Sequence, residues 1–397
     1  MSDRRRVFDP EDPEHVRSGV PFDELAALRR ECPVAKTPAG AWFLSRRREV
    51  DAVLLDVESF GSDMTPGTGI DGFENVPEEQ LFLPEIAEPR HGQIRRLFNS
   101  ALGVHRTQKI APFVRETCER LVDAFADQRE PDLHAAFAMP IPSHVIAHIL
   151  GLPEGAAEKL IEWSFDGSVM FRPASPAFAP AGPPIHAYLR DWIAEERRKA
   201  EPSSHTVKVF LEAEVEGRLL TDVEIAHQLQ TMVLGGAHTT RGLLAHCVER
   251  LIVMPGLFDR LDRDRALVRA FVEESLRHDS PAHRVTRRCL KDATVGDTPM
   301  QAGDWLSVSL ASANRDESRY ADGDAFRLDR EDPRDHIAFG GGPHICPGAS
   351  LARLEGNTAV ETLLDRFAAI EPLPGHAYPP IPANLSYQPL PARLTPR

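Results

Sequence analysis

One stretch of sequence, near the carboxyl end of the chain, decides the fold. It reads Phe339-Gly340-Gly341-Gly342-Pro343-His344-Ile345-Cys346-Pro347-Gly348-Ala349, and a periodic run, SLARLEGNTAVETLLDRF, follows it from residue 350. Three consecutive glycines lose much backbone entropy on folding, so they indicate unusual backbone angles or a close approach of another group. The periodic run predicts a helix over residues 350–367, which places Cys346 just before a helix amino terminus.

This position favours a thiolate at Cys346. The positive end of a helix dipole and nearby backbone amides both stabilise negative charge on sulfur. Because glycines let a flat ligand lie against the chain, such a thiolate suits axial ligation of haem iron. The alternative is a buried structural cysteine beside a phosphate-binding glycine loop. That kind of loop would also want a lysine or a strand-to-helix G-x-G, and the segment has neither.

Composition narrows the class of protein. The chain has 397 residues, of which 42% are hydrophobic and 27% charged, as in globular proteins. The formal net charge of −14 argues against a broad nucleic-acid-binding surface. No apolar run approaches the roughly 18–20 residues of a membrane helix, and the amino terminus has no apolar signal segment. The scattered cysteines, never paired as C-x-x-C, favour a reducing compartment, so we expect a cytoplasmic protein with no membrane or nucleic-acid partner.

Helical periodicity dominates the chain, which predicts a mainly α fold with a minor β part in a single domain over residues 1–397. The β-rich parts are expected near residues 41–60, 283–311 and 376–397, and one helical run covers residues 91–125. The longest predicted helix covers residues 221–254, with a capping box of Thr221 and Glu224 at its start. Its centre reads Gly235-Gly236-Ala237-His238-Thr239-Thr240. Each glycine inside a helix costs about 1 kcal/mol relative to alanine, so some group must need the space.

The cysteine segment resembles the signature of the cytochrome P450 family, F-G-x-G-x-H-x-C-x-G-x-x-L-A-R, at every defined position through Arg353. Glu274 and Arg277 match the family's E-x-x-R, and residues 313–316 and 326–330 resemble the stretch before the cysteine loop. The resemblance therefore covers nearly the whole chain. It implies the cytochrome P450 fold of the bacterial soluble haem-thiolate monooxygenases, with haem between a long central helix and a cysteine loop.

One departure from the family pattern concerns the partner of the E-x-x-R pair. Ala325 stands where many relatives carry an arginine, which leaves the third member of the family's Glu-Arg-Arg cluster open. Arg330 is the candidate for it. A helical (i, i+3) pair on a surface would contribute under about 1 kcal/mol. In the family the pair is buried and anchors the cysteine loop.

The resemblance also implies which residues hold and use haem b. Cys346 would ligate the iron, and His91, Arg95, Arg287 and His344 would hold the propionates. The further cofactor contacts implied are Gly236, Phe339, Gly340 and Gly348. Thr239 matches the oxygen-activating threonine, whereas His238 stands where the family carries an acidic residue. His238 could relay protons, contact substrate or act as a spacer.

The activity implied is insertion of one oxygen atom of O2 into a mainly hydrophobic small organic substrate, with electrons from a separate ferredoxin-type donor and its NAD(P)H-dependent reductase. His283 and Arg284 stand where apolar residues are common, so a carboxylate, hydroxyl or carbonyl on the substrate is expected unless Arg284 turns outward. A peroxide-driven oxygenase is one alternative, against which Thr239 argues. A non-catalytic haem binder or gas sensor is the other, and the missing acid favours it slightly.

Overall fold

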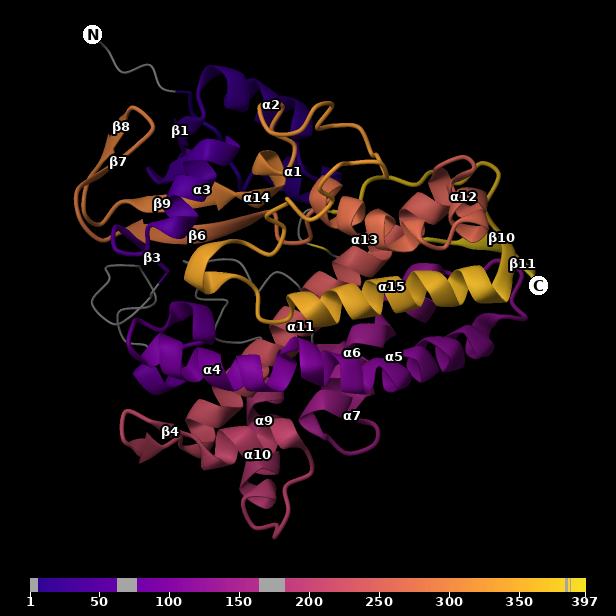
Figure 1. Cartoon of the computed structure of the whole chain (residues 1–397), viewed down its shortest axis with the longest axis horizontal. Coiled ribbons are helices and arrows are strands. Elements are labelled where there is room, and N and C mark those ends of the chain that lie inside the picture. The colour runs from indigo at the N-terminus through magenta and orange to yellow at the C-terminus, as the bar shows by residue number, and fades with distance from the viewer. Residues whose placement is uncertain (1–5, 63–76, 164–182, 383–384, 386) are drawn as a thin grey trace. The chain divides into compact units, whose positions relative to one another are not determined.

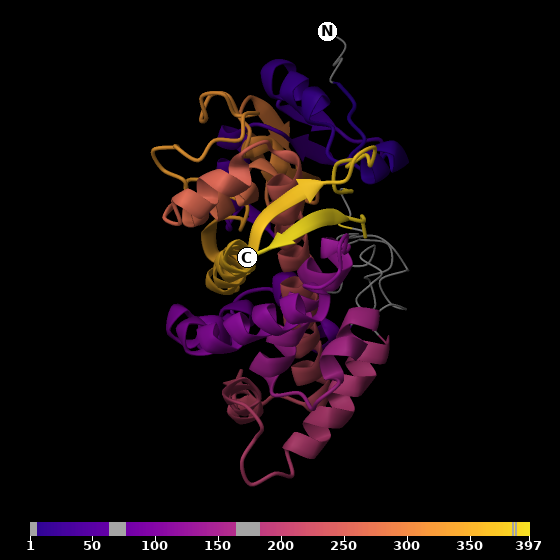
Figure 2. The ribbon, with the colours of Figure 1, turned by 90° about the vertical axis from the view of Figure 1, so that its right-hand side faces the viewer.

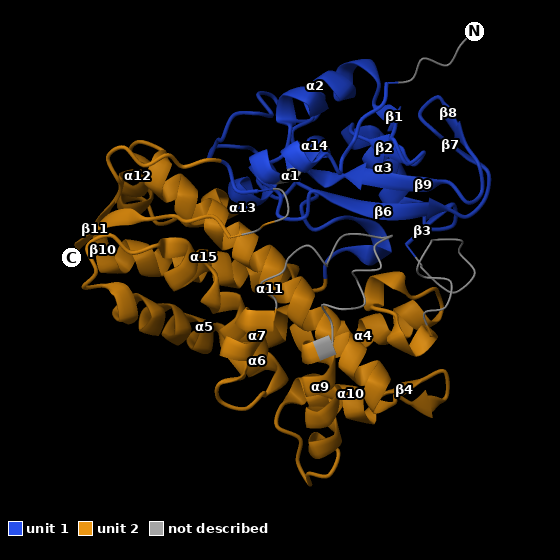
Figure 3. Cartoon of the chain, turned by 180° about the vertical axis from the view of Figure 1, so that it is seen from behind, with its two compact units in different colours: residues 1–63, 273–346, 380–384 blue, residues 64–272, 347–379, 385–397 orange. Residues whose placement is uncertain are grey.

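The computed structural model describes residues 6–62, 77–163, 183–382, 385 and 387–397. Contacts between residues divide the chain into two compact units, each assembled from segments that are far apart in the sequence (Figure 3). Unit 1 comprises residues 1–63, 273–346 and 380–384, and unit 2 comprises residues 64–272, 347–379 and 385–397. The single domain expected from the sequence stays a prediction.

A five-stranded sheet forms the centre of unit 1. Its strand order is β1-β2-β9-β6-β3, in which β1 is Val34–Lys36, β2 Trp42–Leu44, β9 Trp305–Ser309, β6 Arg284–Cys289 and β3 Phe60–Gly61. Strands β2 and β9 pair in parallel, and the other neighbours pair antiparallel. Buried side chains of helix α3 (Arg47–Leu55), such as Val50 and Leu54, share one apolar core with Leu306 and Val308 of β9. The sheet therefore fixes α3, which will matter for the cysteine loop.

Shorter elements complete unit 1 (Figure 1). They are α1 (Pro13–Ser18), α2 (Phe22–Glu31), the hairpin β7 (Ala293–Val295) with β8 (Thr298–Met300), α14 (Leu310–Ala313) and the 3-10 turn η5 (Gly342–His344). Helix α13 (Leu267–His278) belongs to unit 1 from residue 273 onward.

Unit 2 is mostly helical. Its helices are α4 (Arg90–Leu102), α5 (Val104–Phe125), α6 (Pro140–Leu150), α7 (Ala156–Trp163), α9 (Pro183–Glu196), α10 (His205–Glu212), α11 (Asp222–Val253), α12 (Leu257–Arg263) and α15 (Ala349–Arg366). The 3-10 turns η1 (Glu78–Gln80) and η2 (Leu83–Glu85), the π-helix η3 (His134–Ala138) and the strands β4 (Glu214–Val215) and β5 (Arg218–Leu219) lie between them. Helix α15 lies alongside α5, and α11 packs against α6, α9 and α15 (Figure 1). Within the described ranges, no helix combines the length and apolar character needed to cross a membrane.

The long helix begins as the sequence predicts. Thr221 Oγ1 accepts a hydrogen bond from the Glu224 amide, and the Glu224 carboxylate accepts one from the Thr221 amide. Glu224 also accepts from Arg218 and from Arg90 at the start of α4. Burial alone would raise the pKa of Glu224, but these hydrogen bonds and the two guanidinium charges lower it to about 2. The ionised carboxylate therefore joins the start of α4 to the start of α11.

The mainly α fold with a minor β part is confirmed, with two differences of detail. The helical run over residues 91–125 is two helices, because the chain turns at Gly103, where ψ is 158°. A Cβ at that position would lie 2.7 Å from the Asn99 carbonyl oxygen. The carboxyl-terminal β part, in turn, begins earlier than residue 376. Strand β10 (Phe367–Pro372) follows α15 directly and pairs with β11 (Ala392–Pro396), as Figure 2 shows.

Candidate functional site

The cysteine loop of unit 1 is closed by its own backbone. The Cys346 amide donates to the Phe339 carbonyl at 2.9 Å, and the Gly340 amide donates to the Ile337 carbonyl at 2.8 Å. Cys346 is exposed, so it is not a buried structural cysteine. Helix α15 begins three residues later, with Gly348 as its amino-terminal cap. The thiol therefore lies at the end of a backbone-closed loop, three residues before a helix begins.

Gly340 and Gly342 occupy this loop for different structural reasons. Gly340 and Gly342 have φ values of +73° and +65°, which other residues adopt rarely. A Cβ on Gly342 would lie 2.4 Å from the Leu54 carbonyl oxygen of α3. The close approach predicted for the glycines is therefore, at Gly342, an approach to the protein's own backbone. A Cβ on Gly340, by contrast, would have no described atom within 4 Å, and the haem contact of Gly340 stays a prediction.

The E-x-x-R pair is buried and has the expected third member. Arg277 and Glu274 form a two-pronged ion pair, with Nε–Oε2 at 2.8 Å and Nη2–Oε1 at 2.7 Å, and their side chains are 1% and 2% exposed. Arg330 Nε donates to Glu274 Oε2 at 2.9 Å, which confirms Arg330 as the third member of the cluster. Ala325 contributes its backbone instead, because its carbonyl accepts from Arg277 and Arg330.

This cluster supports the cysteine loop through Asn314. Arg277 Nη1 donates to the Asn314 carbonyl at 2.7 Å, and the Asn314 side-chain oxygen accepts from the Ile337 amide at 2.8 Å. Ile337 in turn accepts from Gly340, the first glycine of the loop. The anchoring role expected for the pair therefore runs through an asparagine that holds the start of the loop.

Arg287, on β6, is a buried cation with unused hydrogen-bonding capacity. Its side chain donates to the Thr286 carbonyl, but its Nε is buried without a hydrogen-bond partner, and no ion pair of Arg287 is found among the described residues. Burial lowers the pKa of Arg287 to about 10, so it is still charged at neutral pH. A buried guanidinium without a carboxylate is costly unless an anion binds it. A haem propionate is such an anion, so this residue fits the expected cofactor.

The other expected propionate residues lie in defined surroundings. His344, in the cysteine loop of unit 1, has Nε2 3.1 Å from Ser62 Oγ. His91, in α4 of unit 2, is buried, and its Nδ1 lies 2.8 Å from Glu88 Oε1. Arg95 is half-buried one turn further along the same helix, so it shares a face with His91.

Of the two glycines at the centre of α11, only one packs closely against another helix. A Cβ on Gly236 would lie 2.8 Å from Ile146 Cδ1 of α6, so a larger residue there would require the Ile146 side chain to move. The haem contact of Gly236 stays a prediction. Gly235 has no described atom within 4 Å of a Cβ position, and its carbonyl accepts from Thr239 Oγ1 at 2.7 Å. The threonine hydroxyl is therefore held beside an open stretch of the helix.

Comparison with known proteins agrees with these features. The family model described as "Cytochrome P450" matches residues 168–396. The erythromycin C-12 hydroxylase of Saccharopolyspora erythraea is 33% identical over 359 residues, which are 88% of this chain and 87% of that protein. The chain belongs to the cytochrome P450 family. A second relative, the cyclomarin C epoxidase CymV of Salinispora arenicola, is 32% identical over 83% of this P450 and 84% of its own length.

Solved structures give the same result for the fold of this P450. A mutant of P450 EryK in complex with erythromycin B superposes with a TM-score of 0.85 at 30% identity, over 94% of this chain and 95% of that one. CYP109Q5 from Chondromyces apiculatus superposes with a TM-score of 0.84 at 30% identity, over 98% and 99% of the two chains. This protein is thus a P450 monooxygenase with the P450 fold, and the non-catalytic alternative is set aside.

The histidine at the family's acidic position has a partner that the sequence analysis missed. Arg241 Nη2 lies 3.3 Å from His238 Nδ1 and also donates to the Leu385 carbonyl at 2.8 Å. His238 and Arg241 are 4% and 5% exposed. Since a guanidinium can only donate, a hydrogen bond between them requires the His238 tautomer that carries its proton on Nε2. A charged residue inside a buried helix was the signal that could have revealed Arg241.

Arg284 corrects the expectation of a polar substrate group. Its Nη1 donates to the Pro10 carbonyl at 2.6 Å, and its Nη2 donates to the Glu11 carboxylate. The charge therefore has a protein counter-ion, and the premise that substrate must satisfy it is wrong. His283, whose carbonyl accepts from the Ala311 amide, stays a predicted substrate contact.

Proposed function

We propose that this P450 binds haem b through the Cys346 thiolate and oxygenates a mainly hydrophobic small organic substrate. The observation that carries the proposal is the exposed Cys346 thiol in a backbone-closed glycine loop. Burial of the Glu274–Arg277–Arg330 cluster behind that loop supports it, because a ligand to iron must be held rigidly. When bound, haem supplies the activation of O2 and the transfer of one oxygen atom.

Four residues are proposed to hold the haem carboxylates, and two of them carry direct support. Arg287 has a buried guanidinium whose Nε lacks a partner, which suits a charge-assisted hydrogen bond to a propionate. His344 is fixed near Ser62 within the cysteine loop itself. His91 and Arg95 share one face of α4. The contacts of Phe339, Gly340 and Gly348 with the macrocycle belong to the same proposal.

Proton delivery is proposed to depend on Thr239 and His238. The Thr239 hydroxyl donates to the Gly235 carbonyl, so its oxygen can still accept a hydrogen bond from a proton donor such as water. Because Arg241 occupies Nδ1 of His238, the ring exchanges a proton at Nε2 and does not pass one from one nitrogen to the other. We therefore propose that His238 acts as an Nε2–H donor, a more limited role than a two-ended relay.

The names of the relatives support a small organic molecule as the substrate. They include a hydroxylase of erythromycin, an epoxidase of cyclomarin C and a steroid C26-monooxygenase. Electrons are proposed to come from a separate ferredoxin-type protein and its NAD(P)H-dependent reductase. The cytoplasmic location expected from cysteine usage stays a prediction.

The test compares two cysteine variants. Cys346→Ala should abolish the strongly red-shifted Soret band of the reduced CO complex, because the thiolate ligand is removed. Cys32→Ala, which removes a half-buried thiol outside the loop, should keep that band. A Cys346→Ala protein that retains a thiolate-type spectrum would refute the assignment.

The source of electrons distinguishes the peroxide-driven alternative from the O2 pathway. Thr239 favours the O2 pathway, in which product formation requires NAD(P)H, a ferredoxin and its reductase. Product formation with hydrogen peroxide, together with no product formation with NAD(P)H, ferredoxin and reductase, would favour the alternative. Thr239→Ala should divert reducing equivalents to peroxide while substrate affinity changes little.

A further inference from the structure

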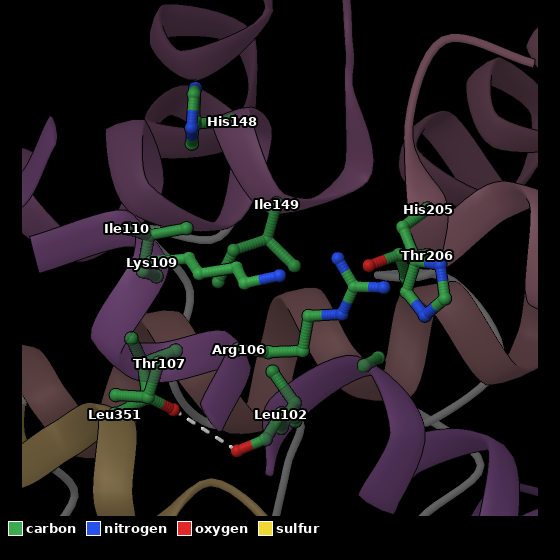
Figure 4. A pocket seen from close by; sticks show the side chains of 11 residues that line it. Leu102, Arg106, Thr107, Lys109, Ile110, His148, Ile149, His205, Thr206 and Leu351 are labelled. Carbon is green, nitrogen blue, oxygen red and sulfur yellow. Dashed lines mark hydrogen bonds between the residues drawn. The ribbon is translucent and has the colours of Figure 1, made fainter. Parts of the chain in front are cut away.

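Unit 2 contains a cavity of about 140 Å³ that the proposed oxygenase activity does not use (Figure 4). It lies where the α4–α5 junction meets the end of α6, the start of α10 and the start of α15. We propose that this cavity binds a small carboxylate that has an apolar body. Its polar lining includes Arg106, Lys109, His205 and Thr206.

The polar side of the cavity is cationic and contains no acid. Figure 4 shows the Arg106 guanidinium and the Lys109 ammonium directed into the same space, opposite His205 and Thr206. Neither Arg106 nor Lys109 forms an ion pair with any carboxylate in the part of the chain that the structure describes. Lys109 is exposed and Arg106 is half-buried, so both keep contact with water while no carboxylate neutralises either of them. An anionic ligand would relieve their repulsion.

Two further features of the wall favour an anion. The start of α10 faces the cavity, since His205 and Thr206 are its first two residues after the cap Ser204. The Ser204 hydroxyl accepts from the Val207 amide, so the amides of the first two residues have no acceptor within the helix. Burial and the charges of nearby cations, Arg106 and Lys109 among them, hold the pKa of His205 below its usual range. The lowered pKa favours the neutral form of His205, so the positive charge of this wall comes from Arg106 and Lys109.

Aliphatic side chains also line the cavity and limit the size of the ligand. Leu102, Ile110, Ile149 and Leu351 contribute aliphatic surface, which inorganic phosphate would leave unused. A cavity of about 150 Å³ lined by apolar side chains holds benzene. A carboxylate on a body of that size, for which benzoate is a convenient probe, therefore fits both the cationic and the aliphatic part of the lining.

The inference is independent of haem binding, because no lining residue is among those proposed to hold haem or to deliver protons. It is tested by titrating the purified full-length holoprotein with benzoate, benzamide and inorganic phosphate in a calorimeter. Benzoate should bind, and benzamide and phosphate should bind at least tenfold more weakly. Benzamide lacks the negative charge, and phosphate lacks the apolar body.

Variants locate the binding. Arg106→Gln and Lys109→Gln should each weaken benzoate binding about tenfold or more, whereas Arg17→Gln, which removes an exposed arginine of unit 1, should leave it unchanged. The Soret band should not move during the titration, because the cavity is separate from the proposed haem residues. Equal benzoate affinity in wild type and Arg106→Gln, or equal affinity for benzoate and benzamide, would overturn the proposal. Failure of haem binding in Cys346→Ala would leave it standing.

Discussion

Replacing Glu274 by glutamine should destabilise unit 1 more than any exposed substitution. The carboxylate accepts two hydrogen bonds from Arg277, one from the Arg327 amide at 2.7 Å and others from Arg330. Glu274→Gln removes the charge and turns an NH2 group toward these donors. Arg277, only 1% exposed, then remains as a buried cation, and removing one partner of a buried pair costs about 3–5 kcal/mol.

The effect should depend on pH in a defined direction. Burial raises the pKa of Glu274. The hydrogen bonds and the charge of Arg277, with hydrogen bonds from the Arg327 amide and Arg330, lower the pKa by more than burial raises it, so the net pKa is below its usual value. The stabilisation is therefore fully present above the ordinary glutamate pKa of about 4.3 and is lost as pH falls through the lower folded value. The difference between wild type and Glu274→Gln should shrink in that acidic range.

Urea unfolding at pH 7 measures the free energy directly, and Glu331→Gln is the matched control. Glu331 is exposed and has no ion pair within the described chain, so its substitution should change stability by less than about 0.5 kcal/mol. If Glu274→Gln lies within about 1 kcal/mol of Glu331→Gln, or if its effect does not shrink in acid, the buried pair does not stabilise the cysteine loop as described.

Three further predictions follow from local geometry. Gly342→Ala should cost about 1–3 kcal/mol more in thermal or urea unfolding than Gly340→Ala, because φ is similar at both sites but only Gly342 meets the Leu54 carbonyl; equal costs would contradict this reasoning. Arg241→Met should free Nδ1 of His238, so that nitrogen-15 NMR of the ring detects both neutral tautomers and the yield of product per NAD(P)H falls; an unchanged single tautomer would show that Arg241 does not set it. Arg284→Leu should change stability by less than about 1 kcal/mol and leave the preference between acidic and neutral substrate analogues unchanged in spectral titrations, and a changed preference would restore its role in substrate binding.

Local sequence patterns predicted the elements that carry their own signals. The capping box of Thr221 and Glu224 located the start of α11, and helical periodicity located α15 to within one residue at each end. The buried cluster was also predictable once Arg330 was chosen from residues 326–330, which resemble the family's stretch before the cysteine loop. In each case the determining interactions lie on one helix or beside a recognisable motif.

Contacts between distant segments could not be predicted in this way. The counter-ion of Arg284 lies 273 residues away, in a segment without a motif, so the sequence left its charge unexplained. Gly342 is required by the Leu54 carbonyl, a backbone atom that no side-chain pattern reports. The break at Gly103 was missed for another reason, since helical periodicity continues across it and only the glycine marks the turn.

The parallel pairing of β2 with β9 has a consequence for synthesis on the ribosome. Roughly 260 residues separate residue 44 at the end of β2 from residue 305 at the start of β9, so at about 5–20 residues per second translation needs about 13–50 s to supply the partner strand. During that interval the nascent β1–β2 hairpin presents an unpaired, largely apolar edge, the kind of edge that pairs with other chains. Expression at low temperature or with a chaperone that shields the emerging amino-terminal segment should therefore raise the yield of native protein.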